Sequence, residues 1–377
     1  MLIYFDNAAT TRVCPEAAEA ALRVMREEYG NPSSSHALGR QARDILEEAR
    51  EKTAAALGGK REEVFFTSGG TEADNLALFG GFELMCHRGK HIITSETEHD
   101  AVLNAAKRLA ALGADVTFLK PDGKTGAVPA DAVREALRDD TVLVSLMLVN
   151  NETGARNPVE EVARLLKTSG SRALLHVDAV QAFCKTAFSV KTLMADLVSV
   201  SGHKIHAPKG SGALWVKTGV KPKPVFFGGG QEKGLRSGTE ALPGIAAFGE
   251  AARIGKERLP QAEAHLRELH DYTLTRLREA IPDVILIADG EPAILPLSLP
   301  GYRSEVLLNF LDAEGVCVSK SSACKRGGRS HVLEAMGLPA RVIDGAVRVS
   351  FSRENTTEEA ESFVRLLAAA AARLAHN

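Results

Sequence analysis

The segment Val142-Leu-Val-Ser-Leu-Met-Leu-Val149 decides the fold, because nearly all of its side chains are apolar. A strand with one face in water alternates apolar and polar residues, whereas a continuous apolar run is typical of a strand buried on both faces. Such strands lie inside mostly parallel sheets that helices cover on both sides. The segment therefore predicts an α/β protein.

Outward from this segment, short β-rich runs alternate with helical patterns through the first two thirds of the chain. The runs occupy residues 63–67, 91–95, 115–119, 173–177, 197–200 and 213–216. Segments rich in Ala, Leu, Glu and Arg separate most of them, for example residues 35–57 and 71–84. The alternation predicts a large domain built on a mostly parallel sheet of seven strands.

The pattern changes after Phe248. A charged helical stretch at residues 251–280, which we expect to bend or break at Pro260, leads into separated strands near residues 284–287, 294–298, 316–319 and 346–351. Thr356 and Glu359 match a capping box that would start a final helix. We expect a large domain at residues 15–250 and a smaller α+β domain made of residues 1–14 and 251–377.

Composition excludes several classes of protein. The 377 residues are 45% hydrophobic and 25% charged, with a net charge of −2 and no long basic run, so neither a nucleic-acid nor a membrane partner is expected. Five scattered cysteines without a CxxC pair argue against a disulfide framework and a zinc site. The first residues do not have the pattern of a signal peptide. These features favour a cytoplasmic protein.

Three patterns suggest chemistry, and each has a simpler explanation. The run Thr67-Ser-Gly-Gly-Thr71 joins a strand to a helix and suits a bound phosphate, although alone it is better explained as an ordinary capped turn. Asp178 ends an apolar strand, where a buried carboxylate needs a cation such as the protonated ring of pyridoxal phosphate. An aspartate that caps the next helix is about as good an explanation. Lys204 follows another apolar strand at the rim of the sheet, where desolvation favours imine formation. A surface lysine is the usual alternative, but this context is uncommon by chance.

A fourth pattern is the polar loop that contains Cys324. Lys325, Arg326 and Arg329 lie close to it in sequence and would favour its thiolate. An incidental loop cysteine is the alternative, although an exposed thiol is a liability in the cytoplasm. Cys317 alternates with valines as in a strand, so we expect it to be a buried small apolar residue.

In combination these residues identify a family. The chain resembles the fold-type I pyridoxal-phosphate enzymes of the class V aminotransferase group, and within it the NifS/IscS-like cysteine desulfurases. The matching motifs are Tyr4-Phe-Asp-Asn-Ala-Ala-Thr-Thr11, Gly30-Asn-Pro-Ser-Ser-Ser-His36, Thr67-Ser-Gly-Gly-Thr-Glu-Ala-Asp-Asn75, Glu96-Thr-Glu-His99, Val149-Asn-Asn-Glu-Thr-Gly154, His176-Val-Asp-Ala-Val-Gln181, Ser199-Val-Ser-Gly-His-Lys204, Gly228-Gly-Gly-Gln-Glu232 and Leu235-Arg-Ser-Gly-Thr239.

The resemblance implies a role for each matching residue around pyridoxal 5'-phosphate. Lys204 would bind the cofactor as an imine and later move the Cα proton of the substrate. Asp178 would pair with the ring nitrogen, Gln181 would contact the ring hydroxyl, and His99 would stack on the ring and shuttle protons. The residues that would hold the phosphate are Gly70, Thr71, Ser201 and His203, together with Thr239 from the partner subunit of a homodimer.

The resemblance also implies a substrate and a product. Arg348 would clamp the carboxylate of L-cysteine, with Asn151 and Asn31 nearby; Asn151 would also approach the cofactor. Cys324 would take the sulfur as a persulfide, releasing L-alanine, and pass it to an acceptor protein such as an iron–sulfur scaffold. No metal site is expected, apart from transient iron–sulfur ligation by Cys324. The residues that surround Cys324 depart from the family's usual Ser-Gly-Ser-Ala-Cys, which leaves the acceptor open.

Two alternatives stay open from the sequence. One keeps the cofactor and changes the reaction, as in a selenocysteine lyase or another class V enzyme. The other is a weakly active component of sulfur relay or assembly that works bound to a partner. The intact cofactor motifs favour the desulfurase over both.

Overall fold

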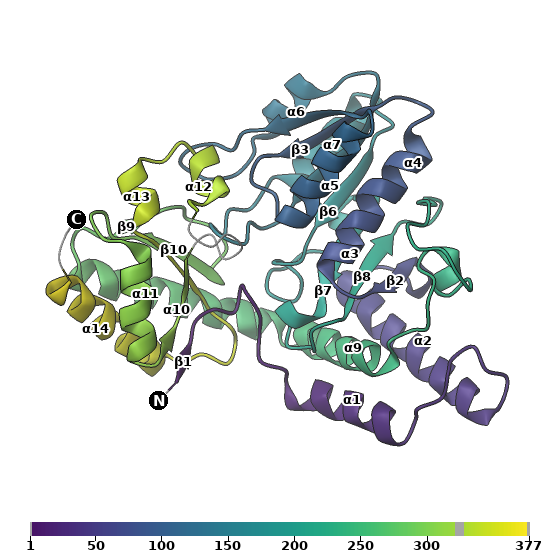
Figure 1. Cartoon of the computed structure of the whole chain (residues 1–377), viewed down its shortest axis with the longest axis horizontal. Coiled ribbons are helices and arrows are strands. Elements are labelled where there is room, and N and C mark those ends of the chain that lie inside the picture. Colours follow the sequence, from purple (N-terminus) through teal and green to yellow (C-terminus); the bar gives the residue numbers. More distant parts are fainter. Residues whose placement is uncertain (1, 321–327, 375–377) are drawn as a thin grey trace.

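The structure, a computed structural model, describes residues 2–320 and 328–374. Its larger sheet has seven strands in the order β2-β8-β7-β6-β5-β3-β4 (Figure 1). They are β2 (Val64–Thr67), β3 (His91–Ser95), β4 (Asp115–Leu119), β5 (Thr141–Met147), β6 (Leu174–Asp178), β7 (Leu197–Ser201) and β8 (Gly212–Val216). β8 is antiparallel to both of its neighbours, and the other pairs that adjoin in this order are parallel. The predicted mostly parallel sheet is confirmed.

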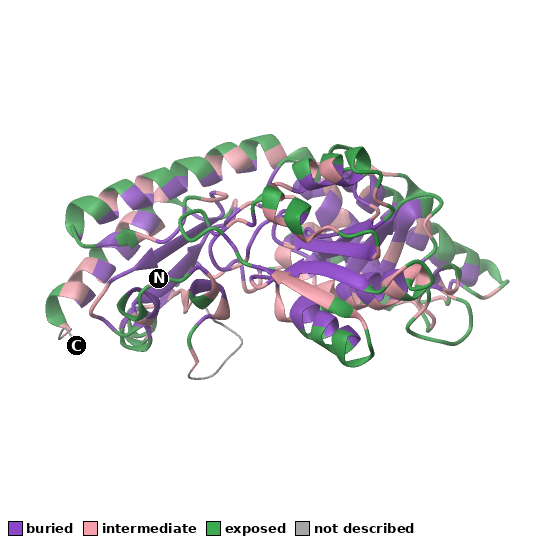
Figure 2. Ribbon diagram, turned by 90° about the horizontal axis from the view of Figure 1, so that it is seen from above, coloured by how far each residue is buried: buried purple, intermediate pink, exposed green. Residues whose placement is uncertain are grey.

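Helices cover both faces of this sheet. They are α1 (Pro15–Arg26), α2 (Ala37–Leu57), α3 (Gly70–Asn75), α4 (Gly81–Met85), α5 (Asp100–Ala111), α6 (Ala130–Ala136), α7 (Val159–Thr168), α8 (Val190–Leu193) and α9 (Leu242–Glu257). Successive residues of β5 show why both faces are covered. Leu143 packs into an apolar core with α3 and α5, and Val144 packs into another with α2, α7 and α9. Figure 2 shows the buried strands between helices whose outer sides are exposed.

The C-terminal part of the chain has its own antiparallel sheet, in the order β12-β13-β10-β9. Its strands are β9 (Ile285–Leu286), β10 (Ile294–Ser298), β12 (Ser319–Lys320) and β13 (Ala346–Ser350). The accompanying helices are α10 (Leu259–Ala280), α11 (Ser304–Ala313), α12 (His331–Ala335), α13 (Ala340–Asp344) and α14 (Thr357–Arg373). A separate apolar core that includes Leu295, Val347 and Phe363 holds this part together.

The helical stretch between the two sheets differs from the prediction at its start. It begins with α9 at Leu242 rather than at residue 251, because proline at position 243 fits the first turn of a helix, where no backbone N–H is needed. α9 ends at Glu257 and α10 starts at Leu259 with Pro260 in its first turn, so the predicted break at this proline is confirmed. The expected domain boundary at residue 250 lies within α9 and stays a prediction.

The two ends of the chain follow the sequence patterns. The capping box of Thr356 and Glu359 starts α14 as predicted. At the other end, β1 (Ile3–Tyr4) pairs in parallel with β11 (Val316–Cys317). Among the described residues, we find no helix with both the length and the apolar character needed to span a bilayer.

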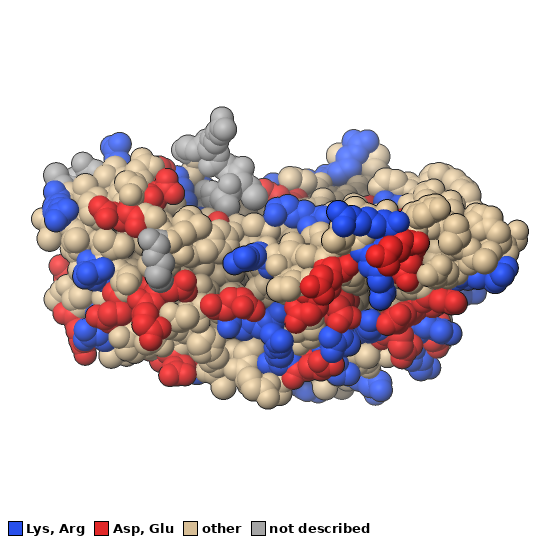
Figure 3. Space-filling model, turned by 90° about the horizontal axis from the view of Figure 1, so that it is seen from below, with Lys and Arg blue, Asp and Glu red and all other residues tan. Residues whose placement is uncertain are grey.

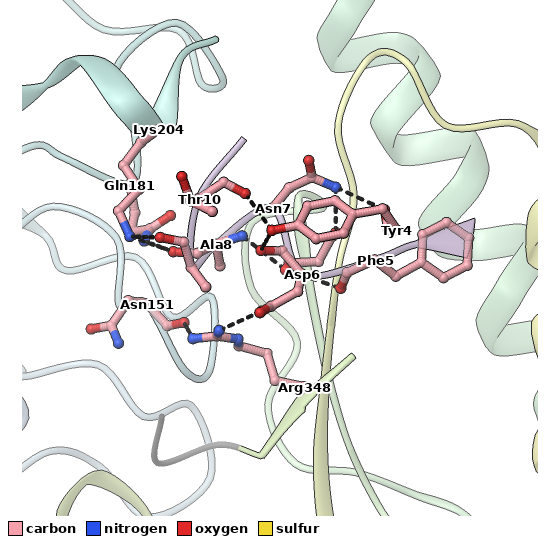
Figure 4. A network of polar contacts seen from close by, with 12 residues as sticks. Tyr4, Phe5, Asp6, Asn7, Ala8, Thr10, Asn151, Gln181, Lys204 and Arg348 are labelled. Carbon is pink, nitrogen blue, oxygen red and sulfur yellow. Dashed lines mark hydrogen bonds and ion pairs between the residues drawn. The ribbon is translucent and has the colours of Figure 1, made fainter. Parts of the chain in front are cut away.

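Residues 6–11, which we name the N-terminal bridge, connect the two sheets. The backbone N–H of Asn7 donates to the carbonyl oxygen of Ser350 at the end of β13. The backbone N–H of Thr11 donates to the carbonyl oxygen of His203, just after β7. Figure 4 shows this segment running between side chains that belong to both parts of the protein.

Candidate active site

Asp178 lies at the carboxyl end of β6, next to β7. It is buried, and its Oδ1 accepts a hydrogen bond of 2.9 Å from the backbone N–H of Val180. Burial raises the pKa of its carboxyl, and the hydrogen bond from Val180 and the electrostatic interactions with His99 and Lys204 offset only part of this rise. A buried acid of this kind, placed close to a strand-end lysine, suits the protonated nitrogen of a pyridine ring.

The Lys204 side chain reaches the N-terminal bridge. Lys204 ends the single helical turn Gly202–Lys204 that follows β7. Its Nζ donates to the carbonyl oxygens of Ala8 (2.6 Å) and Ala9 (2.8 Å). Nε2 of Gln181 donates to the same Ala8 oxygen at 2.9 Å (Figure 4). The structure thus brings the side chains of Lys204 and Gln181 together at the Ala8 carbonyl oxygen.

Small residues at the start of α3 lie against the end of β7. A Cβ atom on Gly70 would come within 2.9 Å of Val180 Cγ2 and 3.5 Å of Ser201 Cβ, so glycine is needed for the close packing at this position. A Cβ atom on the preceding Gly69 would meet only Ser201 Oγ, at 4.0 Å, so space remains beside that hydroxyl. The hydroxyl oxygen of Ser201 is buried without a hydrogen-bond partner among the described residues. Thr71 is exposed in the first turn of α3. Burial and the charge of Lys204 lower the pKa of the nearby His203 to about 4, so its ring is neutral near pH 7.

His99 caps the start of α5. Its Nδ1 accepts a hydrogen bond of 3.1 Å from the backbone N–H of Ala101, so a neutral ring carries its proton on Nε2. The preceding Glu98 is buried and accepts hydrogen bonds from the Ser95 hydroxyl (2.7 Å) and the Met147 N–H (3.1 Å). Burial raises the pKa of Glu98 to about 8. His99 is therefore oriented by the backbone and lies beside a carboxyl that is mainly protonated at pH 7.

Arg348 lies on β13, with 2% of its surface exposed. Its Nη1 donates to the carbonyl oxygen of Asn151 (2.9 Å), and its Nη2 donates to Oδ1 of Asp6 (2.8 Å; Figure 4). Its Nε is buried and has no hydrogen-bond partner in the described part of the chain. Buried polar groups are rarely left unpaired, so this N–H is suited to a ligand's oxygen.

Three predicted residues are not placed in this cluster. Asn31 and Thr239 are exposed, and Asn31 Oδ1 accepts from the backbone N–H of Ser33. The role of Thr239 in a partner subunit stays a prediction, and Cys324 lies outside the described residues. Cys317 was expected to be buried and is half-buried, because only Val316 of the short β11 faces the core.

The charge near the Cys324 loop also differs from the prediction. Arg329, expected to favour the thiolate, binds Asp344 through two hydrogen bonds, Nε to Oδ1 at 2.7 Å and Nη2 to Oδ2 at 2.8 Å. Lys320, on the other side of the loop, pairs with Glu305. The positive charge of both residues is therefore largely balanced by a neighbouring acid.

The residues present fit pyridoxal phosphate. The buried hydroxyl of Ser201, which has no hydrogen-bond partner in the described part of the chain, lies beside the space at Gly69 and suits a phosphate oxygen. Asp178 offers a buried carboxylate to a ring nitrogen, and Lys204 offers an amine to an aldehyde. These groups come from the ends of β6 and β7 and from the start of α3, the edge where open α/β sheets bind ligands.

Sequence reasoning missed three charged residues around the predicted site. Asp6 binds Arg348, and Lys185 donates from its Nζ to Gln181 Oε1 at 3.1 Å. Glu152 is buried, accepts a hydrogen bond from the Ser330 hydroxyl, and has its pKa raised by burial to about 7. Asp6 and Glu152 belong to two of the matching motifs. Each is the one charged residue of its motif, and this was the signal from which a role in the site could have been predicted.

Comparison with known proteins agrees with this geometry. The sequence model of the aminotransferase class-V family matches residues 3–363. The chain is 41% identical to a putative cysteine desulfurase IscS 1 of Bacillus subtilis, with 99% of each chain covered. It is 40% identical to a cysteine desulfurase IscS of Methanosarcina thermophila, with 97% of this chain and 91% of the relative covered. A solved structure of a NifS-like protein superposes with a TM-score of 0.94 at 39% identity, covering 99% of this chain and 100% of that one.

Proposed function

The chain belongs to the class V aminotransferases and functions as a cysteine desulfurase, and from that premise we propose that it binds pyridoxal phosphate at Lys204 and moves sulfur from L-cysteine to Cys324. One observation carries the proposal. The N-terminal bridge accepts hydrogen bonds from Lys204 at Ala8 and Ala9 and holds Arg348 at Asp6. An amine for an aldehyde and a guanidinium for an α-carboxylate thus contact the same short segment.

When bound, pyridoxal phosphate supplies an electron sink that makes the Cα–H bond of an amino acid acidic. Asp178 holds the proton on the ring nitrogen that this sink requires. Arg348 binds the α-carboxylate of cysteine, which fixes Cα near Lys204. The Lys204 amine then takes the Cα proton, and His99, with its proton on Nε2, returns protons to the substrate.

We propose that the sulfur step belongs to Cys324. Its thiolate attacks the sulfur of the substrate, so that an S–S bond forms while the C–S bond breaks. The electron pair of the broken bond stays on the carbon fragment, which takes up a proton and leaves as L-alanine. The persulfide on Cys324 is then passed to an acceptor protein, for which an iron–sulfur scaffold is the leading candidate.

Mass spectrometry of the cofactor-loaded protein after treatment with L-cysteine tests this proposal. One added sulfur atom is expected on the peptide that contains Cys324, and alanine should form in parallel. Cys324→Ser should lose both, whereas Cys86→Ser, which changes an exposed cysteine elsewhere in the chain, should keep both. Normal alanine and persulfide formation by Cys324→Ser would refute the assignment. Repeating the assay with selenocysteine would show whether the protein prefers the heavier substrate.

We further propose that the protein works as a homodimer in the cytoplasm, with Thr239 facing the phosphate of the partner subunit. The exposed position of Thr239 supports this arrangement. Light scattering on the cofactor-loaded protein should give twice the mass of the chain. A monomer that retains full activity would contradict the shared site.

A further inference from the structure

In the proposed function Asp6 only holds Arg348, and its negative charge has no role. Asp6 is fixed by its backbone, which forms a parallel bridge with Ser350 at the end of β13, and its carbonyl oxygen accepts from the Tyr4 hydroxyl at 3.3 Å. Its side chain turns toward Arg348 on the same strand (Figure 4). The acid is 19% exposed, whereas the arginine is almost completely buried. The carboxylate of Asp6 is therefore more accessible to solvent than the guanidinium that it binds.

The contacts of Arg348 leave room for one more partner. Asp6 and the Asn151 carbonyl oxygen each accept from a different terminal nitrogen, and Nε has no partner among the described residues. Glu152 also feels the charge of Arg348, but burial raises its pKa to about 7, so it carries only part of a negative charge near neutrality. Asp6 is the acid in direct contact, and it supplies most of the balancing charge.

We propose that Asp6 shares Arg348 with the α-carboxylate of the substrate and thereby sets how tightly the site holds amino acids. Without substrate, Asp6 neutralises a guanidinium that would be costly to bury alone. When a carboxylate binds, it competes with Asp6 for the same positive charge, so its attachment is weakened and L-alanine is released more readily. The inference rests on the proposed role of Arg348 as the carboxylate clamp.

Two substitutions of Asp6 separate its charge from its role in positioning. Asp6→Asn keeps an oxygen that accepts from Nη2 and removes the negative charge, so the attraction of Arg348 for a second carboxylate should rise. Asp6→Ala also removes the acceptor and allows the guanidinium to turn away from the position in which it faces the site. Opposite effects are therefore expected from the two variants, whereas a residue that only supports the fold would weaken binding in both.

Calorimetric titration of the cofactor-loaded protein with L-alanine and with ethylamine, which lacks the carboxylate, provides the test. Asp6→Asn should bind L-alanine about threefold to tenfold more tightly than the unchanged protein, with ethylamine binding unchanged. Asp6→Ala should bind L-alanine more weakly. Asp140→Asn is the matched control, because it removes an acid that pairs with Arg138 on the exposed surface, and both affinities should stay the same.

The outcomes distinguish this inference from the proposal beneath it. If Arg348→Gln keeps the preference for L-alanine over ethylamine, the clamp is wrong and the inference about Asp6 fails with it. If Arg348→Gln loses that preference and Asp6→Asn does not tighten L-alanine binding, only the inference about Asp6 is overturned. Thermal unfolding checks that each variant folds. If Asp6→Asn does not fold, Asp6→Ser replaces it, because serine also removes the charge and keeps a polar group.

Discussion

The two halves of the candidate site are built in different ways. The cofactor half takes Asp178 and Lys204 from the ends of adjacent parallel strands, where the pairing of Asp178 with Ser199 fixes their relative position. The substrate half joins Arg348, Asp6 and Asn151 from three segments that are far apart in the sequence. The first half depends on the register of one sheet, and the second depends on how the smaller sheet packs against the larger one.

This difference determines what each half can tolerate. Strands β6 and β7 are fully buried between two layers of helices, so the cofactor half is held by a large apolar core. The substrate half depends in addition on hydrogen bonds that join distant segments, from Arg348 to Asp6 and from Arg348 to Asn151. A substitution in the cofactor half should therefore abolish chemistry, whereas one in the substrate half should mainly change affinity.

Lys204→Ala should have the largest effect. Without this amine the protein should lose the visible absorbance of a bound cofactor imine, and turnover of L-cysteine should fall by at least about 10²- to 10⁴-fold, the usual contribution of a positioned acid–base group. Absorption spectra after incubation with pyridoxal phosphate measure the first effect, and alanine production measures the second. Lys217→Ala, which changes an exposed lysine paired with Asp196, should resemble the unchanged protein. A coloured and active Lys204→Ala protein would remove the basis of the cofactor half.

Arg348→Gln should have the next largest effect, and it should act on affinity. Loss of hydrogen bonds to a charged carboxylate costs about 1.5–3 kcal/mol, so KM for L-cysteine should rise by about tenfold to a hundredfold. The absorbance of the bound cofactor should persist, because the cofactor half is intact. Steady-state kinetics and spectra on the same sample check both expectations, with Arg138→Gln as the surface control. Loss of the cofactor absorbance would show that the two halves do not act separately.

The comparison also explains what the sequence could predict. Strand register and strand ends follow from local patterns. The burial of both faces of β5 and the positions of Asp178 and Lys204 at strand ends were therefore predictable. The ion pair of Arg348 with Asp6 was not, because no local periodicity reports which side chains meet when two sheets pack. The pairing of Arg329 with Asp344 was missed for the same reason, and it changed the expected charge near Cys324.

Two buried carboxyls, those of Glu98 and Glu152, predict how stability depends on pH. Burial raises the pKa of Glu98 from 4.5 to about 8 and that of Glu152 from 4.5 to about 7. Above the ordinary pKa the unfolded chain loses this proton while the folded protein keeps it, so the free energy of unfolding falls as pH rises. The fall contributed by Glu98 should continue to about pH 8, and that contributed by Glu152 should end near pH 7.

Isosteric glutamines test this expectation. Each unit of pKa shift corresponds to about 1.4 kcal/mol of stability. Relaxation of the protein around a charged carboxylate makes the actual loss of stability smaller than this conversion gives. At pH 8, Glu98→Gln should therefore be about 1–3 kcal/mol more stable than the unchanged protein. Glu152→Gln should gain less, and at pH 5 both variants should differ little from the unchanged protein. Urea unfolding of the cofactor-free protein between pH 5 and pH 8 measures these differences. Stability curves of the same shape for all three proteins would contradict the shifts.

Arg329→Gln should have the smallest effect, although it changes a charge close to Cys324 in the sequence. The guanidinium is bound to Asp344, and both side chains are about half exposed, so the pair is screened by solvent and adds little net positive charge to its surroundings. The rate at which iodoacetamide modifies Cys324, followed by mass spectrometry across pH, should change by less than about twofold. Asp344→Asn, which leaves Arg329 without its acid, should speed the modification at neutral pH, because an unbalanced cation favours the thiolate. A large decrease in Arg329→Gln would mean that this arginine acts on Cys324 despite its ion pair, and the original expectation from the sequence would then be correct.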